Sequence, residues 1–234
     1  MLDVLRTMSE VTRLYLIRHG ATVLTAEDRF AGSTHVQLSD EGRSQAAALA
    51  ERLKNVPLNA VYASPMDRTM ETASILAQPH GLELLQRDGL KEISHGHWEG
   101  LTRQEMTAAF PEEAAAWDED PYTFAPEGGE TGLQVTARAL PVVMDIFNAH
   151  RGQHVAIVSH KATIRLVLSS LLGFDPRRYR DNLDQSPCAL NILDGRGPTC
   201  FRLALFNDTS HYTRWDQGDT PPVSSQRLSS RWSG

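Results

Sequence analysis

The sequence predicts an α/β fold, a three-layer α/β/α sandwich with a mostly parallel central sheet of about six strands. A helical and loop insertion is expected over one end of the sheet, where the candidate site lies. Short apolar runs bounded by turn-forming residues alternate with longer segments of helical periodicity, as is typical of strands joined by crossover helices. The length of 234 residues suits one domain that buries its own core, and no internal repeat is present.

The strands are predicted from six apolar runs. The first, LYLI from Leu14, is apolar at every position, as expected of a buried strand. Each run is bounded by polar or turn-forming residues, which limits its length to that of a strand. The predicted strands are Arg13–Ile17, Asn59–Tyr62, Leu82–Gln86, His154–Val158, Ala189–Leu193 and Phe201–Leu205.

The helices are predicted from apolar residues that recur on one helical face. The first, Asp40–Lys54, follows Ser39, which suits the N-cap position, and its apolar face consists of Ala46, Leu49, Ala50 and Leu53. For the second helix, Ser64 is the expected N-cap, Pro65 the first residue and Asp67 a favourable charge in the first turn. Two long helical patterns follow at Thr131–Asn148 and Ala162–Leu172.

Residues 93–130 differ from the rest of the chain because they mix Gly, Trp, His and Pro with a short helical patch around Arg103–Phe110. We interpret them as a capping insertion within one domain that spans residues 13–211. Residues 1–12 and 212–234 are expected to be tails. The chain after Asn207 is rich in Ser, Asp, Thr, Gly and Pro and is predicted to be poorly ordered.

The composition argues against several classes of partner. With 23 Lys and Arg against 29 Asp and Glu, the chain offers no basic surface for nucleic acid or for an anionic membrane. No stretch is long and apolar enough to span a bilayer. Cys188 and Cys200 form no disulfide framework and are expected to be reduced. Because no targeting segment is evident, we expect a cytoplasmic protein.

Polar residues come directly or shortly after four of the apolar runs in the sequence. In an open α/β sheet, ligands bind beyond the carboxyl ends of the strands, so these side chains are expected to converge there. They are Arg18 and His19 after the first strand, Arg68 just into the helix after the second, Glu92 shortly after the third and His160 after the fourth.

This set of residue types points to phosphate chemistry. Arg18 and Arg68 can each donate paired hydrogen bonds to a phosphate dianion and stay charged at physiological pH. His19 can attack phosphorus through a neutral ring nitrogen, and Gly20 lets backbone and phosphate approach closely. The helix that starts after His160 is expected to add backbone N–H donors aimed at the same anion.

Several separate motifs, in the right order, resemble those of the histidine phosphatase superfamily, the phosphoglycerate-mutase-like fold, in its phosphatase-type branch. The resemblance covers roughly Leu14 to His211. The motifs are LIRHG, the F-x-G of Phe30 and Gly32, LSDEGRSQA from Leu38, ASPMDRTMETA from Ala63, KEISHGHWEG from Lys91 and VSH ending at His160.

The resemblance implies a cofactor-free and metal-independent phosphomonoester hydrolase that acts on a small phosphorylated metabolite. His19 is expected to carry a covalent phosphate, while Arg18, Arg68 and His160 hold the phosphoryl oxygens. Glu92 is expected to protonate the leaving oxygen and then to accept a proton from the incoming water.

The chain departs from the family pattern at three positions. Thr25 stands where many members have Asn, His35 where an Asp is common, and Lys161 where Gly often follows the second histidine. Together with Gly32, we place Thr25 and Lys161 at the substrate. The positive charge of Lys161 near the pocket mouth suggests a substrate with a second anionic group such as a carboxylate, although a solvated lysine at a helix start is the more ordinary interpretation.

Other interpretations stay open at this point. The residues after Glu92, HGHWEG, are similar to the phosphatase form, and the long insertion expected of a mutase is absent, but a phosphoglycerate mutase is the alternative activity. A non-catalytic scaffold domain of the same fold is another. His95 and His97 alternate in a loop as metal ligands can, although they lack partners in ligand spacing. A homodimer is neither indicated nor excluded.

Overall fold

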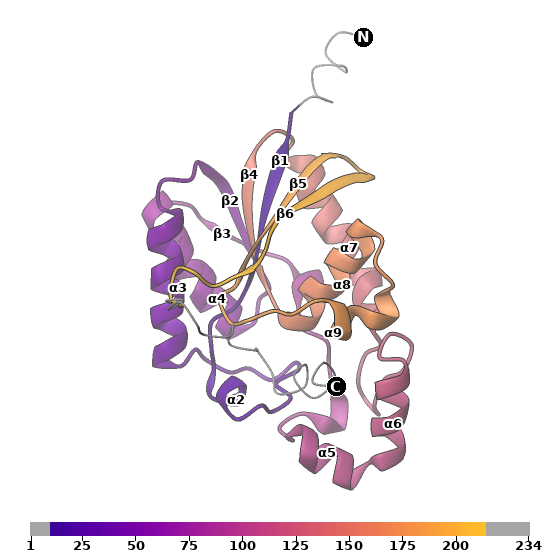
Figure 1. The fold of residues 1–234 in the computed structure, drawn as a ribbon. Coiled ribbons are helices and arrows are strands. Elements are labelled where there is room, and N and C mark those ends of the chain that lie inside the picture. The colour runs from indigo at the N-terminus through magenta and orange to yellow at the C-terminus, as the bar shows by residue number, and fades with distance from the viewer. Residues whose placement is uncertain (1–9, 214–234) are drawn as a thin grey trace, which may run out of the picture.

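The computed structural model describes residues 10–213, which form a six-stranded sheet between two layers of helices (Figure 1). The strand order is β3-β2-β4-β1-β5-β6. The first four of these run parallel, whereas β5 is antiparallel to β1, and β6 to β5. The strands are β1 (Thr12–Arg18), β2 (Leu58–Ala63), β3 (Leu84–Gln86), β4 (His154–Ser159), β5 (Leu190–Gly197) and β6 (Cys200–Asp208).

This architecture confirms the predicted fold class and all six predicted strands. The third strand is shorter than expected, because pairing with β2 begins only at Leu84. The last two strands are longer than expected, since they continue as an antiparallel pair to the turn between Gly197 and Cys200. Apolar pattern alone does not set such ends, which depend on pairing with a neighbouring strand.

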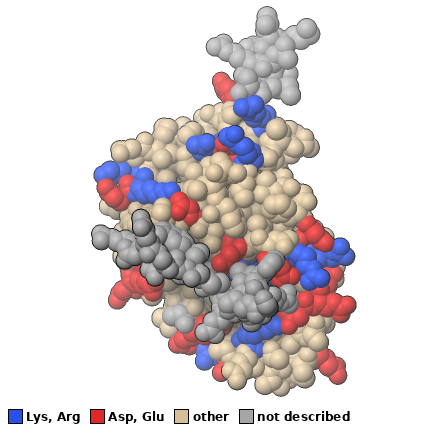
Figure 2. All heavy atoms as spheres, viewed as in Figure 1, with Lys and Arg blue, Asp and Glu red and all other residues tan. Residues whose placement is uncertain are grey.

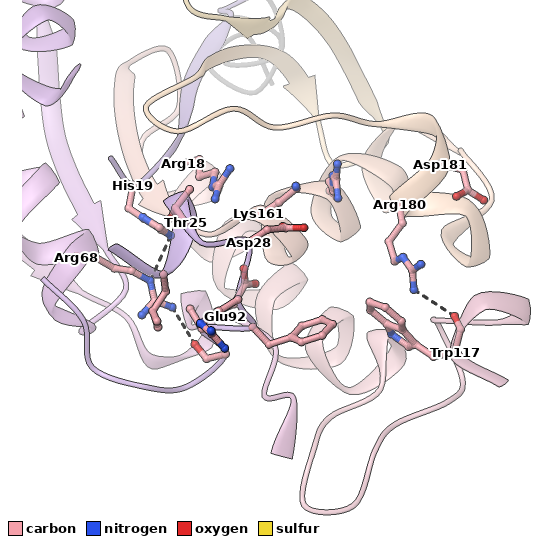
Figure 3. A pocket seen from close by; sticks show the side chains of 16 residues that line it. Arg18, His19, Thr25, Asp28, Arg68, Glu92, Trp117, Lys161, Arg180 and Asp181 are labelled. Carbon is pink, nitrogen blue, oxygen red and sulfur yellow. Dashed lines mark hydrogen bonds between the residues drawn. The ribbon is translucent and has the colours of Figure 1, made fainter. Parts of the chain in front are cut away.

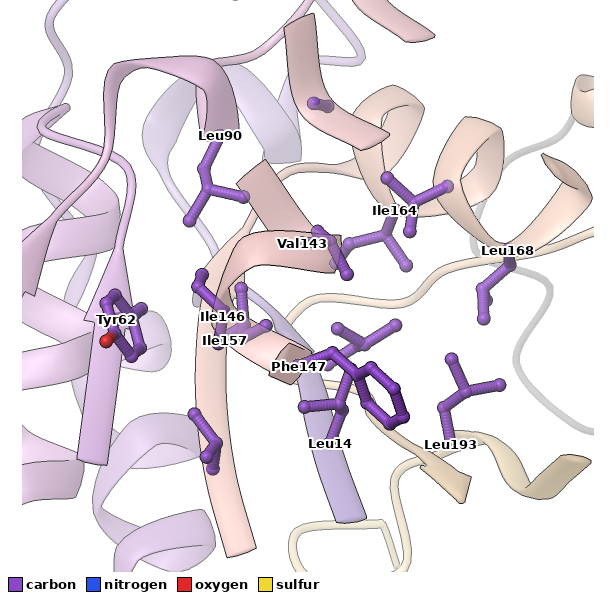
Figure 4. Packing of buried hydrophobic residues seen from close by; sticks show 14 of the residues in the cluster. Leu14, Tyr62, Leu90, Val143, Ile146, Phe147, Ile157, Ile164, Leu168 and Leu193 are labelled. Atoms are coloured by element: carbon purple, nitrogen blue, oxygen red, sulfur yellow. The ribbon is translucent and has the colours of Figure 1, made fainter. Parts of the chain in front are cut away.

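Helices cover both faces of the sheet. On one face α3 (Asp40–Leu53) and α4 (Asp67–Ala77) pack against alternate strand residues such as Tyr15 and Ile17. On the other face α7 (Gly132–Ala149) and α8 (Lys161–Leu172) pack against Leu14 and Leu16 and their neighbours (Figure 4). Because both faces of β1 are covered, every position of the LYLI run is apolar rather than every second one.

The start of α4 differs from the prediction. The helix begins at Asp67 with Met66 at the N-cap position and no side-chain cap, so Ser64 and Pro65 precede it. The Ser64 hydroxyl instead lies 2.8 Å from Nε2 of His160, and its backbone N–H donates to Val158 O. The expected cap of α3 is confirmed, because Ser39 Oγ accepts a hydrogen bond from the N–H of Gly42.

The insertion forms two short helices beyond the carboxyl ends of the parallel strands, at the bottom of Figure 1. These are α5 (Arg103–Ala109), close to the predicted patch, and α6 (Pro111–Glu119), which was not predicted. They share a small core of their own with Phe30, in which Trp98, Met106 and Trp117 are buried. Proline at the first position and two glutamates in the first turn of α6 were signals that could have revealed it.

The remaining described elements are short. They are α2 (Val23–Ala26), α9 (Tyr179–Asn182) and four 3₁₀ helices, η1 (Gln78–His80), η2 (Asp88–Leu90), η3 (Gly96–Trp98) and η4 (Pro176–Arg178). No helix within residues 10–213 is long and apolar enough to cross a bilayer. On the face drawn in Figure 2, acidic and basic side chains lie near one another.

The prediction for the chain after Asn207 is wrong for its described part. β6 includes Asp208, whose carboxylate accepts a hydrogen bond from Arg52 at 2.5 Å. The hydroxyl of Tyr212 donates to the carbonyl of Pro187 at 2.6 Å. The rest of the predicted C-terminal tail, residues 214–234, and residues 1–9 of the N-terminal tail lie outside the described residues. Cys188 is buried and Cys200 exposed, each as a free thiol.

Candidate active site

The side chains predicted to converge do so at the carboxyl ends of β1, β2 and β4 (Figure 3). The sheet register explains why: Arg18 pairs with Ser159 and Ala63 with Val158, so the residues that follow these strands emerge side by side. One pocket is lined by the predicted residues Arg18, His19, Thr25, Gly32, Arg68, Glu92 and Lys161. His160 is fully buried, with its ring centroid 5.2 Å from that of His19.

His19 is held as a neutral imidazole with a defined tautomer. Its Nδ1 lies 2.7 Å from the carbonyl oxygen of Gly20, which can only accept, so Nδ1 carries the proton. The lone pair is therefore on Nε2, which accepts a hydrogen bond from Nε of Arg68 at 3.2 Å. Burial, followed by the charges of Arg68 and Arg18, holds the pKa of His19 well below its usual value. This is the form that a nucleophilic histidine requires.

Two buried guanidinium groups flank that imidazole. Arg68 donates to the carbonyls of Thr34 and Gly32, both at 2.8 Å, in addition to His19. Arg18 donates to Gln185 O at 2.7 Å, while its buried Nε has no partner among the described residues. Burial lowers the pKa of Arg18, and it lowers the pKa of Arg68 to about 10. Both groups remain charged at neutral pH, so the site is poised to attract an anion.

The Glu92 carboxylate accepts hydrogen bonds from backbone N–H groups at the start of α8, which were expected to bind the substrate phosphate. Its two oxygens accept hydrogen bonds from the N–H groups of Ala162 and Thr163, each at 3.3 Å, in the first turn of α8. The N–H of Ile93 donates to the same carboxylate at 3.0 Å. The expectation that the start of α8 binds the anion is corrected accordingly. These amides instead fix the position of Glu92 at the pocket wall.

The role expected of Gly20 is also corrected. A side chain at this position would place its first carbon 2.5 Å from Gly42 O, so glycine is needed here for the close approach of α3 rather than of a phosphate. Gly32 is a different case. Its φ of +46° favours glycine, and a side chain there would collide with the carboxylate of Glu99. Gly32 O accepts one of the hydrogen bonds that hold Arg68.

His160 and Thr25 interact with neighbouring hydroxyls. His160 Nε2 lies 2.8 Å from Ser64 Oγ, and its Nδ1 is buried without a partner among the described residues. Burial, then the charge of Arg68, holds the pKa of His160 well below its usual value. Thr25 Oγ1 lies 3.0 Å from Thr22 Oγ1 within the capping box of α2, so its hydroxyl stabilises that helix start beside the pocket.

The three histidines with uncertain roles lie in ordinary surroundings. His95 packs its ring against Phe30 with centroids 4.7 Å apart, and His97 Nε2 lies 2.8 Å from the carboxylate of Glu113. His35 is exposed and pairs with Asp67 at 3.1 Å. Within residues 10–213 no group of three or more His, Cys, Asp or Glu side chains is arranged to hold a metal ion. His95 and His97 thus belong to the packing of the insertion.

Sequence reasoning missed several residues that also line the pocket. Arg165 lies one helical turn after Lys161 on α8, and this spacing could have indicated it. Arg180 on α9 and Trp117 on α6 carried no such signal, because only the tertiary fold brings their short helices to the site. Asp28, Arg29 and Asp181 complete the charged lining.

The chain is similar to known proteins over most of its length. A family model described as the histidine phosphatase superfamily (branch 1) matches residues 14–209. Phosphoserine phosphatase 1 of Hydrogenobacter thermophilus is 32% identical over 169 residues, covering 72% of this chain and 80% of that protein. Glucosyl-3-phosphoglycerate phosphatase of Mycolicibacterium vanbaalenii is 36% identical over 171 residues, covering 70% and 75%.

The fold is likewise that of a solved structure. The Bacillus stearothermophilus YhfR structure superposes with a TM-score of 0.80 at 31% sequence identity, covering 86% of this chain and 98% of that one. The superposition therefore covers most of this chain.

Proposed function

Because the chain belongs to the histidine phosphatase superfamily and is a phosphatase of that superfamily, we propose that it hydrolyses a small phosphorylated metabolite through a phosphohistidine on His19, without a metal ion. The relatives named above are phosphatases of small phosphorylated metabolites. One observation carries the proposal: the Nε2 lone pair of a neutral, buried His19 lies between two buried arginines at the end of a pocket.

In the first half-reaction, Nε2 of His19 attacks phosphorus and the bond to the ester oxygen breaks. The leaving oxygen takes a proton from the carboxylic acid of Glu92, which lines the same pocket. Arg18 and Arg68 stabilise the charge on the transferring phosphoryl group, and the unpartnered Nδ1 of His160 is available to one of its oxygens.

In the second half-reaction, Glu92 as carboxylate accepts a proton from a water molecule, and that water attacks the phosphohistidine. The phosphorus–nitrogen bond breaks, inorganic phosphate leaves, and Nε2 of His19 regains its lone pair. The proton on Nδ1 stays throughout, since Gly20 O holds it. Both steps use one carboxyl group, first as acid and then as base.

Positive charge that a metal would supply in other phosphatases comes here from guanidinium groups. We therefore expect hydrolysis of p-nitrophenyl phosphate to be unchanged by EDTA and not stimulated by added Mg²⁺ or Zn²⁺. A metal-dependent phosphatase assayed in parallel shows that chelation is complete. Activity that disappears with EDTA and returns with a divalent cation would contradict the metal-independent mechanism.

Arg138 of α7 is proposed to hold the backbone from which Glu92 projects. It donates to the carbonyl of Glu92 at 2.9 Å and to that of Lys91 at 2.8 Å, and its Nε and Nη2 bind the carboxylate of Glu130 at 2.9 Å. Glu130 in turn accepts from the N–H of Ser94. One guanidinium thus ties the start of the insertion to α7.

Replacing Arg138 by Met is expected to lower kcat for an alkyl phosphate by roughly 10- to 100-fold, because misplacing a catalytic group by a small distance costs about that much. The loss in kcat/KM for p-nitrophenyl phosphate should be several times smaller, since that leaving group departs without a proton. Steady-state kinetics on both esters provides the measurement. Arg43→Met, on α3 and away from the pocket, is the matched control; equal losses on both esters would indicate general destabilisation instead.

A further inference from the structure

The pocket has a second group of cationic side chains beyond the phosphate end. Lys161, Arg165 and Arg180 line it together with Trp117. Figure 3 places His19 and Arg68 at one end of the pocket and Arg180 and Trp117 at the other. The mechanism proposed above uses none of these residues. A phosphoryl group seated at His19 leaves this end of the pocket to the rest of the substrate.

Arg165 is a buried cation with donors to spare. Its side chain is only about 7% exposed, and its one hydrogen bond among the described residues runs from Nη2 to Asp184 Oδ1 at 3.1 Å. The buried Nε has no partner there. Buried donors in native proteins are nearly always satisfied, and an orphan in a pocket wall is explained when a ligand supplies the missing acceptor.

Arg180 forms a rigid wall next to it. Its guanidinium carbon lies 3.5 Å from the ring centroid of Trp117, and its nitrogens donate to Trp117 O at 3.2 Å and to Asp118 Oδ1 at 3.1 Å. These contacts join α9 to α6 of the insertion and fix the Arg180 guanidinium in the pocket wall.

The surrounding acids favour a single negative charge over a second phosphate. Asp184 already balances part of the charge of Arg165, and Asp28 and Asp181 also line the pocket. These carboxylates would repel a second dianion more strongly than a single negative charge, and a carboxylate needs only the donors that Arg165 leaves open.

We propose that Arg165, with Lys161 and Arg180 beside it, binds a carboxylate of the substrate, so that the enzyme selects small phosphomonoesters of carboxylic acids. The inference rests on the proposed function, since it concerns the non-reacting part of the same substrate. Planar guanidinium and carboxylate groups match in geometry, and a charge-assisted pair in a buried site discriminates strongly against an analogue without the anion.

The test compares O-phosphoserine with O-phosphoethanolamine, which differ by one carboxylate. For the natural sequence, kcat/KM should favour O-phosphoserine by about 10- to 100-fold, the amount that a charge-assisted hydrogen bond supplies. Arg165→Gln and Arg165→Lys should remove most of that preference through a higher KM, while kcat/KM for p-nitrophenyl phosphate changes only a few-fold. That last value also shows that both variants are folded.

Arg29→Gln is the matched control. Arg29 lines the same pocket, but its guanidinium is bound by Glu27, Gly100 O and Glu105, so its loss should leave the substrate ratio unchanged. The carboxylate site would be overturned if the unmodified protein hydrolysed O-phosphoserine and O-phosphoethanolamine with equal kcat/KM. It would also be overturned if both Arg165 variants kept the kcat/KM ratio of the unmodified protein. The carboxylate site would also be overturned if the kcat/KM ratio of propane-1,3-diol bisphosphate to its monophosphate exceeded the ratio of O-phosphoserine to O-phosphoethanolamine. No hydrolysis of p-nitrophenyl phosphate would instead refute the proposed function itself.

Discussion

Replacing His19 by alanine should lower kcat for p-nitrophenyl phosphate by about 10⁴-fold or more, because the covalent route has no other nucleophile in its place. The neighbouring His160 is not expected to substitute, since its Nε2 is bound to Ser64 and its ring is fully buried. The measurement is steady-state kinetics with a generic aryl ester, whose leaving group departs without a proton, so that kcat/KM reports on the attack by His19.

Two controls separate the loss of the nucleophile from a loss of structure. His35→Ala removes an exposed imidazole paired with Asp67 and should change kcat less than about two-fold, as surface substitutions generally do. Far-ultraviolet circular dichroism and a thermal melt show whether His19→Ala keeps the fold. A folded His19→Ala protein that still turns over the aryl ester would show that another group attacks phosphorus.

The second large effect is expected for Glu92→Gln. Loss of a general acid typically costs about 10²- to 10⁴-fold, so kcat for an alkyl phosphate should fall by that range. The kcat/KM for p-nitrophenyl phosphate covers only the steps up to departure of the leaving group, and it should fall far less, since that group needs no proton. The amide keeps the shape of the carboxyl group, and its one oxygen can still accept from the N–H groups of Ile93 and Thr163.

Plotting log kcat/KM against leaving-group pKa over a series of esters gives the clearest readout for this variant, because kcat/KM excludes the hydrolysis of the phosphohistidine. The slope should be shallow with Glu92 and steep with Gln, because the charge that develops on the leaving oxygen is then no longer neutralised. Parallel lines for the two proteins would assign Glu92 a structural role and leave the proton donor to be found elsewhere.

The sheet could be predicted from the sequence because its signals are local. An apolar run such as LYLI that stops at Arg18 and His19 marks a buried strand and the edge where ligands bind. The parallel register then places the residue after β1 next to the residue after β4 without any further information. The pattern of apolar runs that end on polar residues therefore predicts both the fold and the convergence of the predicted site residues.

What could not be predicted depends on contacts between distant segments. Ser64 has the composition of a helix cap but lies beside His160 instead, because the end of β4 is adjacent to it in the sheet. The amides at the start of α8 bind Glu92, a residue about seventy positions earlier in the chain. Local propensity cannot distinguish such partners, since each is as good a hydrogen-bonding group as the expected one.

The same limit applies to the far end of the pocket. Arg165 lies on a helix whose pattern is otherwise apolar, and Arg180 comes from a helix of only four residues that contacts the insertion. Arg165 has only its spacing of one helical turn from Lys161 as a signal, and Arg180 has none. The contacts of Arg180 with Trp117 and Asp118 form only when the insertion packs against α9.

The proposed mechanism depends on one covalent bond, between phosphorus and Nε2 of His19. Mixing the enzyme with substrate for milliseconds and then quenching in alkali tests for this bond directly. Phosphohistidine survives alkali, so mass spectrometry of the digest should find one phosphoryl group on the peptide that contains His19, present during turnover and missing from the His19→Ala protein. If the quenched enzyme carries no phosphoryl group while phosphate is released in a burst, or if the label maps to a different residue, nucleophilic attack by His19 is contradicted.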